Sequence, residues 1–272
     1  MNDLVAVEQT PVLLLTTHQP EWLATAGVPL FISDTRLRRY TRLPKAVSPW
    51  AADSGGFTAL QRYGRWRTTP EEYVARLRRY RDQAGMMLWA SCQDWMCEPV
   101  VINGGVADGV RFVGTKLTVL EHQRRTVANL VHLRRIAPDL PIAPVLQGFE
   151  ADEYRRCAEL YADHGVDLGR EPIVGIGSVC RRQADEEIHD VVATVRDLGI
   201  RNLHAFGVKT GGLGLYGHLL SSVDSCAWSL NARFRGSPLP GCTGHLTCSN
   251  CLTYAKRWRE GVAKSTGLPL WR

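Results

Sequence analysis

The sequence of 272 residues has no apolar run that approaches the roughly 18 residues a membrane-spanning helix needs. Its first twenty residues start with an acidic group and hold only a short apolar run, which makes a poor signal peptide. A soluble, cytoplasmic protein without membrane contact is therefore expected. Repeats and low-complexity tracts are also lacking, and a content of 44% apolar and 22% charged residues excludes a disordered or fibrous chain.

Two short motifs of common α/β enzymes are missing. The segment after the first predicted strand reads TTHQP where a dinucleotide-binding open sheet would carry GxGxxG, so a doubly wound open sheet is the less favoured fold. No H-x-H pair follows that strand, which ranks a metal-dependent barrel hydrolase built on His18 last among the enzyme hypotheses. The length suits one large α/β domain, and a single domain over residues 1–272 is predicted.

Short apolar runs alternate with amphipathic helical segments along the chain. Several runs are apolar throughout, which is typical of strands buried on both faces. The predicted strands are Val12–Thr17, Pro29–Ser33, Ala46–Asp53, Met86–Cys92, Ile142–Gly148, Pro172–Ser178, Asn202–Val208 and Ser222–Ser229. Helices are predicted at 70–84, 115–136, 151–164, 184–198, 213–220 and 250–264. Eight strands interleaved with helices predict an α/β protein with a parallel, TIM-like (β/α)8 barrel.

Polar residues and one glycine stand near the ends of six of these strands. They are Asp53, Asp94, Gln147, Gly177, Lys209 and Asp224. In a (β/α)8 barrel the carboxyl ends of the strands meet at one face, where the active site lies. Any single Asp in such a position could instead cap the following helix. Together these residues predict one pocket that offers carboxylates, an amide and exposed backbone.

The most specific of these segments is DSGGF, which begins at Asp53. Ser54, Gly55 and Gly56 leave the backbone nearly bare beside the carboxylate, so a flat ligand can approach closely; the alternative is an ordinary tight turn with an Asp cap. Three aromatic residues stand beside the polar positions and could enclose a flat ring, or serve only in packing. They are Phe57, Trp95 and Phe149.

A cluster near the C-terminus has the spacing of metal ligands. Three thiolates and an imidazole match a closed tetrahedral zinc site, and four protein ligands leave no position for a catalytic water. The predicted ligands of this structural Zn²⁺ are Cys242, His245, Cys248 and Cys251, in a zinc-binding segment at about 236–272. Either His204 or His218 could replace His245 by folding back. The remaining cysteines are predicted to be small buried residues: Cys92, Cys97, Cys157, Cys180 and Cys226.

The chain carries 33 basic against 27 acidic residues, and most of the basic ones are Arg. Such charge can simply solvate helix faces, but a planar guanidinium also binds phosphate in a bidentate manner. Five cations on loops after predicted strands, or next to the cysteine cluster, are candidates for phosphate contacts. They are Arg181, Arg182, Lys209, Arg233 and Arg235.

The order of these motifs resembles that of a known enzyme superfamily. ADSGGF, LQGF, the strand end GIGS, an Asp-bearing strand and a Cys-rich cluster follow one another between about Ala46 and Cys251. This arrangement is similar to the tRNA-guanine transglycosylases, and closest to the branch that modifies DNA with 7-deazaguanines. The chain departs from the tRNA enzymes in its shorter length, in Thr58 where their motif has Gln, and in its wider cysteine spacing with an internal His.

The resemblance implies a role for each matched residue. Asp53 would be the general acid/base on the exchanged bases, and Asp224 the nucleophile. Asp94 would recognise the guanine edge, Gln147 the base carbonyl, and the backbone of Gly177 another part of the base. The remaining substrate-binding positions would be Ser54, Gly55, Gly56, Phe57 and Lys209.

The implied reaction exchanges guanine in DNA for a free 7-deazaguanine base, such as the 7-cyano form, through a covalent Asp-glycosyl intermediate. Because a base within a duplex cannot be reached in its stack, it has to be flipped out, or the strand opened by an accessory protein. The same chemistry on tRNA and a non-catalytic, zinc-containing nucleic-acid-binding subunit are the alternatives, and a homodimer is compatible with the family.

Overall fold

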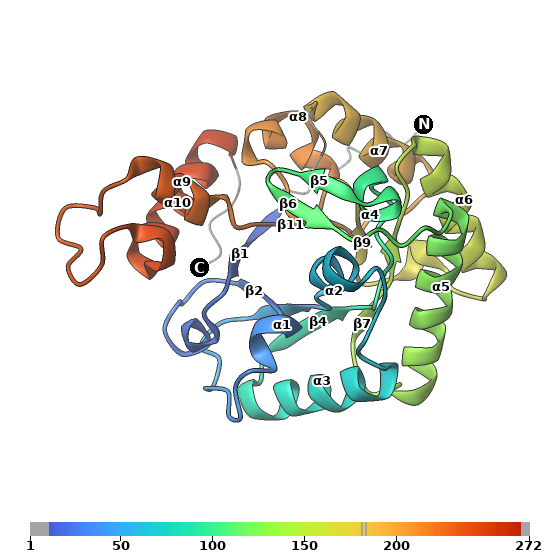
Figure 1. Cartoon of the computed structure of the whole chain (residues 1–272), viewed down its shortest axis with the longest axis horizontal. Helices are drawn as coiled ribbons and strands as arrows, with labels where there is room; N and C mark the ends of the chain where they lie inside the picture. The colour runs from blue at the N-terminus through green and yellow to red at the C-terminus, as the bar shows by residue number, and fades with distance from the viewer. Residues whose placement is uncertain (1–10, 181, 183, 268–272) are drawn as a thin grey trace, which may run out of the picture.

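A ring of parallel strands forms the centre of the computed structural model, which describes residues 11–180, 182 and 184–267. Except at one point, consecutive strands pair in chain order, and the last strand pairs with the first. The strands are β1 (Val12–Thr17), β2 (Leu30–Ser33), β3 (Trp50–Asp53), β4 (Met87–Ser91), β7 (Ile142–Ala143), β8 (Val145–Leu146), β9 (Val174–Ile176), β10 (Leu203–Ala205) and β11 (Ser222–Ser225). The predicted α/β barrel is therefore confirmed (Figure 1).

One predicted strand, Ile142–Gly148, is divided in two at Pro144. Proline has no N–H to give to a strand ladder, and β7 before it pairs only with β4 while β8 after it pairs only with β9. The carbonyl of Pro144 still accepts a hydrogen bond from the Gly175 N–H at 2.8 Å. Together, β7 and β8 occupy the position of one strand in the barrel. The nine strand segments therefore correspond to the eight strands of a (β/α)8 barrel.

Successive side chains along a barrel strand point alternately outward, toward the helices, and inward, into the barrel, and so contribute to two separate hydrophobic cores. In β1, Leu13 and Leu15 belong to the large core between strands and helices, whereas Leu14 lies in a smaller cluster inside the barrel. Phe31 of β2 and Trp89 of β4 join Leu14 in that interior cluster. Because side chains alternate with a period of two, the polar residues that end these strands continue the interior layer toward the carboxyl end of the barrel.

The outer helices are α3 (Pro70–Ala84), α5 (Val119–Ile136), α6 (Ala151–Asp163) and α7 (Asp185–Asp197), with shorter α1 (Asp34–Leu37) and α8 (Leu213–Tyr216). α3 starts as predicted, because Thr69 forms a capping box with Glu72 and Pro70 occupies the first turn. Helix α5 starts later than expected, since the hydroxyl of Thr118 caps it.

Short elements that follow β3 and β4 were not predicted. α2 (Gly56–Tyr63) follows β3, and α4 (Pro99–Asn103) with the hairpin β5 (Gly105–Ala107) and β6 (Val110–Phe112) follows β4. The hairpin packs on α2, where the rings of Phe57 and Phe112 meet edge to face at 5.6 Å. Such short segments carry too little hydrophobic periodicity to reveal themselves in sequence.

The predicted last strand, Ser222–Ser229, ends too late. β11 stops at Ser225, and α9 (Ala227–Arg235) begins two residues further on. Behind it, the predicted zinc-binding segment forms a loop that extends from the barrel at the left of Figure 1, and α10 (Leu252–Thr266) then packs against α9 and β1. Within the described residues, no helix combines the length and apolar character needed to span a bilayer.

Candidate active site and metal centre

A cavity of about 370 Å³ opens at the carboxyl ends of the barrel strands. Seven of the predicted site residues line it: Asp53, Gly56, Phe57, Asp94, Gln147, Gly177 and Asp224. Five of these come from different barrel strands or the turns just after them, although they are far apart in sequence. The folded chain therefore brings the predicted acids and amide together around one space large enough for a purine-sized ligand.

Asp224 is almost completely buried, with 4% of its surface exposed, and each of its carboxylate oxygens has a partner. The hydroxyl of Thr16 donates to Oδ2 at 2.6 Å, and the backbone N–H of Gly207 donates to Oδ1 at 2.9 Å. His204 Nε2 lies 3.3 Å from the same Oδ1, while its Nδ1 lies 2.8 Å from the Ser222 hydroxyl. These contacts fix the orientation of the carboxylate at the cavity wall.

Asp53 lines the same cavity as Asp224 but lies in a different environment. Burial raises the pKa of Asp53 to about 6, hydrogen bonds from the Ser33 side chain and the Gly55 backbone lower it, and the negative charge of Asp224 raises it. A carboxyl group with such a pKa can both release and hold a proton near neutral pH. The charge of Asp224 thus affects the protonation of Asp53.

Asp94, which follows β4, is held by a network of side chains at the cavity. Gln147 Nε2 donates to Asp94 Oδ2, and the Ser54 hydroxyl lies 3.3 Å from Asp94 Oδ1. The hydroxyl of Ser178 is 2.7 Å from Gln147 Oε1 and 2.9 Å from the buried carboxylate of Glu98. Burial, and then the charge of Asp53, raises the pKa of Asp94 to about 7. The network orients the Gln147 amide with its nitrogen toward Asp94.

Gly177 acts here through its lack of a side chain. A Cβ at this position would lie 2.1 Å from Gln147 Nε2, which is an impossible contact. Its N–H donates to the Leu146 carbonyl at 3.0 Å, and its carbonyl accepts from Tyr154 Oη at 2.7 Å. Tight packing under the Gln147 amide therefore requires glycine at 177.

The DSGGF turn leads from β3 directly into α2. Gly55 has a left-handed backbone with φ of 84°, and an added Cβ would lie 2.8 Å from Thr35 Cγ2. Gly55 itself stands at the start of the helix, and no side chain caps α2. The Asp53 carboxylate therefore does not cap α2. Ser54 and Gly55 lie behind the cavity wall, where Ser54 contacts Asp94 as described above.

Other predicted positions lie away from the cavity. Lys209 is exposed on the loop after β10 and does not line it. Trp95 packs in a small hydrophobic cluster, with Arg125 over its ring at 4.7 Å, and Arg182 lies over the ring of Phe149 at 4.8 Å. Neither aromatic ring lines the cavity. Arg181 lies outside the described residues.

The sequence reasoning missed the residues that complete the cavity wall. They are Thr16, Thr17, His18, Phe31, Ser33, Thr35, Arg36, Thr58, Ser91, Met96, Ser178, Cys180, Phe206, Gly207 and Cys226. The prediction that Cys180 and Cys226 are buried core residues is wrong, because the first is half-buried and the second exposed. Alternation from the interior residues Leu14 and Phe31 was the signal that could have found Thr16 and Ser33.

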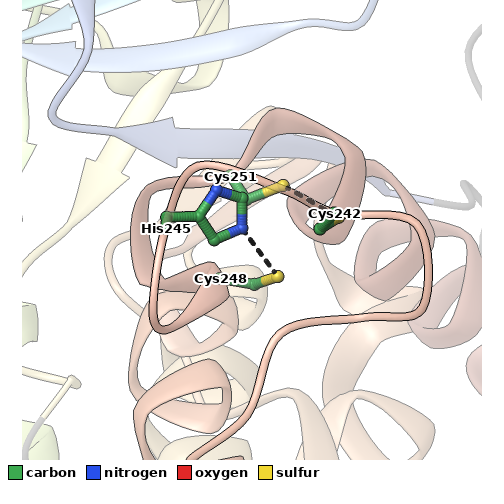
Figure 2. Close-up of side chains that lie close together, drawn as sticks. All are labelled: Cys242, His245, Cys248 and Cys251. Carbon is green, nitrogen blue, oxygen red and sulfur yellow. Dashed lines mark hydrogen bonds between the residues drawn. The ribbon is translucent and has the colours of Figure 1, made fainter.

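The predicted metal ligands converge on one point in the loop after α9. The ligand atoms of Cys242, His245, Cys248 and Cys251 all lie within 4.8 Å of one another (Figure 2). Cys242 Sγ and Cys251 Sγ are 3.8 Å apart, and His245 Nε2 is 3.2 Å from Cys248 Sγ. Thiolates around a tetrahedral zinc ion, with bonds of about 2.3 Å, are separated by about 3.8 Å. The four side chains therefore fit a metal ion, and His245 completes the set.

Comparison with known proteins identifies the family. The family model described as DpdA, DeoxyPurine in DNA protein A, matches residues 10–270. The chain belongs to the DpdA family. No match was found among curated proteins. Membership implies a transglycosylase with a DNA substrate, which takes part in the modification of DNA with 7-deazaguanines. The resemblance noted in the sequence to the DNA-acting branch is thereby confirmed.

Proposed function

We propose that this chain exchanges guanine in DNA for a free 7-deazaguanine base, such as the 7-cyano form, through a covalent intermediate on Asp224. The observation that carries the proposal is that Asp53 and Asp224 line the same cavity, close enough for the charge of one to raise the pKa of the other. A purely binding subunit would gain nothing from buried acids that face a polyanion.

Recognition of the base follows from the fixed orientation of two side chains. Gln147 Nε2 has two hydrogens and gives one to Asp94, which leaves the other for a base carbonyl. The Asp94 carboxylate, when ionised, accepts from the ring N–H and amino group on the same edge of guanine. A 7-deazaguanine presents the same edge, whereas adenine offers neither the carbonyl nor the ring N–H. One pocket can therefore accept both the leaving and the entering base.

The exchange is proposed to proceed in two displacements. In the first, a carboxylate oxygen of Asp224 bonds to the sugar C1′ as the C1′–N9 bond breaks, and guanine leaves with the bonding electrons and a proton from Asp53. In the second, Asp53 takes a proton from N9 of the incoming deazaguanine, which bonds to C1′ and displaces Asp224. Acid and base are regenerated, and the sugar stays attached to the protein while the bases change places.

Zinc is assigned a structural role in this proposal. Cys242, His245, Cys248 and Cys251 would hold Zn²⁺ and thereby fix the loop between α9 and α10. The ion would supply no open coordination position, because four protein ligands complete its tetrahedron. A free base and DNA are then the only partners that the reaction requires, while a homodimer and an accessory DNA-opening protein remain proposals.

Incorporation of isotope-labelled guanine tests the proposal directly. We expect label to enter DNA with the wild-type protein, and the Asp224→Asn variant to abolish incorporation while keeping its folded circular dichroism spectrum and metal content. A labelled protein–DNA adduct trapped with wild type but not with the variant would support the covalent step. Label entering tRNA instead of DNA would favour the alternative substrate, and full activity of the variant would remove Asp224 as the nucleophile.

A further inference from the structure

An aromatic side chain stands exposed on α9, the helix that follows the strand bearing Asp224. Phe234 has 80% of its surface exposed, and Leu230 one turn earlier has 51%. With Arg233, these residues share one side of the helix by their spacing of three and four. The opposite side, with Trp228 and Ala232, is buried against the protein. This exposed face of α9, comprising Leu230, Arg233 and Phe234, is not explained by packing within the chain.

Helix α9 begins at the wall of the cavity. Cys226, directly before the helix, lines the cavity, as does His18 after β1. Burial lowers the pKa of His18, and the positive charges of Arg36 and Arg233 lower it further, which places Arg233 near this cavity residue. A nucleotide entering the cavity would therefore have its neighbours along the strand next to α9.

The charge around this face favours a polyanion. No Asp or Glu occurs between Cys226 and Trp258 in the sequence, whereas that stretch contains Arg233 and Arg235 of α9 and Lys256 and Arg257 of α10. Exposed aromatic rings flanked by Arg are a common means of binding nucleic acid, since the ring stacks on bases while guanidinium groups bind phosphates. A second copy of the chain is less favoured as the occupant, because a twofold interface would place the same positive surface on both sides.

We propose that Phe234 is a wedge that enters the base stack of DNA beside the target guanine, with Arg233 and Arg235 on the adjoining phosphates. The proposal rests on the proposed function, because a wedge is needed only where a base has to leave the duplex. Flipping a base leaves a gap in the stack, and an apolar ring inserted there replaces the lost stacking contacts. Base exchange should therefore require the Phe234 ring on duplex DNA but not on single-stranded DNA.

The test compares Phe234→Ala with wild type on one DNA sequence in two forms. Label incorporation into the duplex should fall at least about tenfold, whereas incorporation into the single strand should change less than about twofold. Phe234→Trp should restore duplex activity, because it keeps a stacking ring. Val47→Ala serves as the matched control, because Val47 is 55% exposed on the loop before β3, at the other end of the barrel. It should leave both activities unchanged.

A binding measurement separates failure of the wedge from failure of the proposed function. A duplex carrying 2-aminopurine next to the guanine should become more fluorescent with wild type and much less so with Phe234→Ala. If wild type incorporates no label into any DNA yet gives the Phe234-dependent fluorescence change, the proposed function fails and the wedge stands. Equal losses on duplex and single strand, no change in either assay, or conversion of a dimer to a monomer in sedimentation would overturn the wedge.

Discussion

The imidazole of His204 lies 3.3 Å from Oδ1 of Asp224 while its other nitrogen meets Ser222, and both the ring and the carboxylate are buried. The three residues belong to β10 and β11, which pair in parallel, so their relation is set by strand register. The contact with His204 would keep the Asp224 carboxylate in one orientation, as a nucleophile that attacks a single substrate atom requires.

Replacing His204 tests whether it positions the nucleophile. We expect His204→Phe to lower kcat for base exchange about 10- to 100-fold, which corresponds to the loss of one hydrogen bond to a charged group. The KM for the free base should change little, because His204 does not line the cavity. His218→Phe, at an exposed histidine, is the control. A large rise in KM with unchanged kcat would contradict a positioning role.

A side chain at position 177 should displace the Gln147 amide. In Gly177→Ala the added Cβ would collide with Gln147 Nε2, so the amide has to turn away from the base. We expect the KM for guanine to rise at least about tenfold, since one base hydrogen bond is lost. Gly214→Ala is the matched control, because a Cβ there meets nothing within 4 Å. Steady-state kinetics with labelled guanine measure both, and equal KM values in the two variants would refute the steric argument.

Removal of one thiolate should release the metal. We expect Cys248→Ser to lose bound zinc and to lower Tm by at least about 5 °C, because a structural metal contributes to folding free energy. Elemental analysis and thermal denaturation measure the two effects. Cys226→Ser should keep the wild-type zinc content, since Cys226 lies outside the four-residue cluster. Unchanged stoichiometry in Cys248→Ser would exclude Cys248 as a ligand.

Burial of Asp94 should make stability depend on pH. Its pKa rises from 3.8 to about 7 on folding, so the folded protein holds this proton more tightly than the unfolded chain. The free energy of unfolding therefore falls as pH rises from about 4 to about 7. Asp94→Asn removes the charge, and we expect its stability relative to wild type to grow across that range, by up to about 4 kcal/mol.

Denaturation with urea at pH 4.5 to 8 measures this difference. Asp139→Asn is a control of opposite sign, because hydrogen bonds from Arg78 and Arg81 lower the pKa of the exposed Asp139. Any stability that Asp139 contributes is complete above pH 3.8, so the difference between this variant and wild type should stay constant over the same range. A difference for Asp94→Asn that also stays constant would show that Asp94 is not protonated in the folded protein near neutral pH.

The barrel could be predicted because its evidence is repeated along the chain. Apolar runs in eight places, interrupted by amphipathic helices, indicate the fold even though individual bounds are wrong, as at Pro144 and Ser225. Polar residues such as Asp53 and Gln147 could be selected because each directly follows an apolar run, which marks the end of a strand in the sequence. The single-domain organisation over residues 1–272 stays a prediction.

The rest of the site depends on relations that sequence does not display. His204 reads as one polar residue in an apolar run, and only the register of β10 against β11 brings it to Asp224. Ser178 lies in left-handed backbone with φ of 57°, which turns its hydroxyl toward Gln147 and Glu98. Lys209 was assigned to the site because it is a cation after a strand, and in the structure it is exposed and does not line the cavity.

The break at Pro144 gives ligand binding a mechanical consequence. Between β4 and β9 the barrel contains only the short segments β7 and β8, which do not pair with each other. The hydrogen bonds from Gln147 to Asp94 and from Ser178 to Gln147 connect residues that follow β4, β8 and β9. A base that bonds to Asp94 and Gln147 would add contacts between the two sides of this break in the strand pairing. Amide protons of β7 and β8 should therefore exchange with solvent more slowly once the pocket is filled, so barrel rigidity itself would report occupancy.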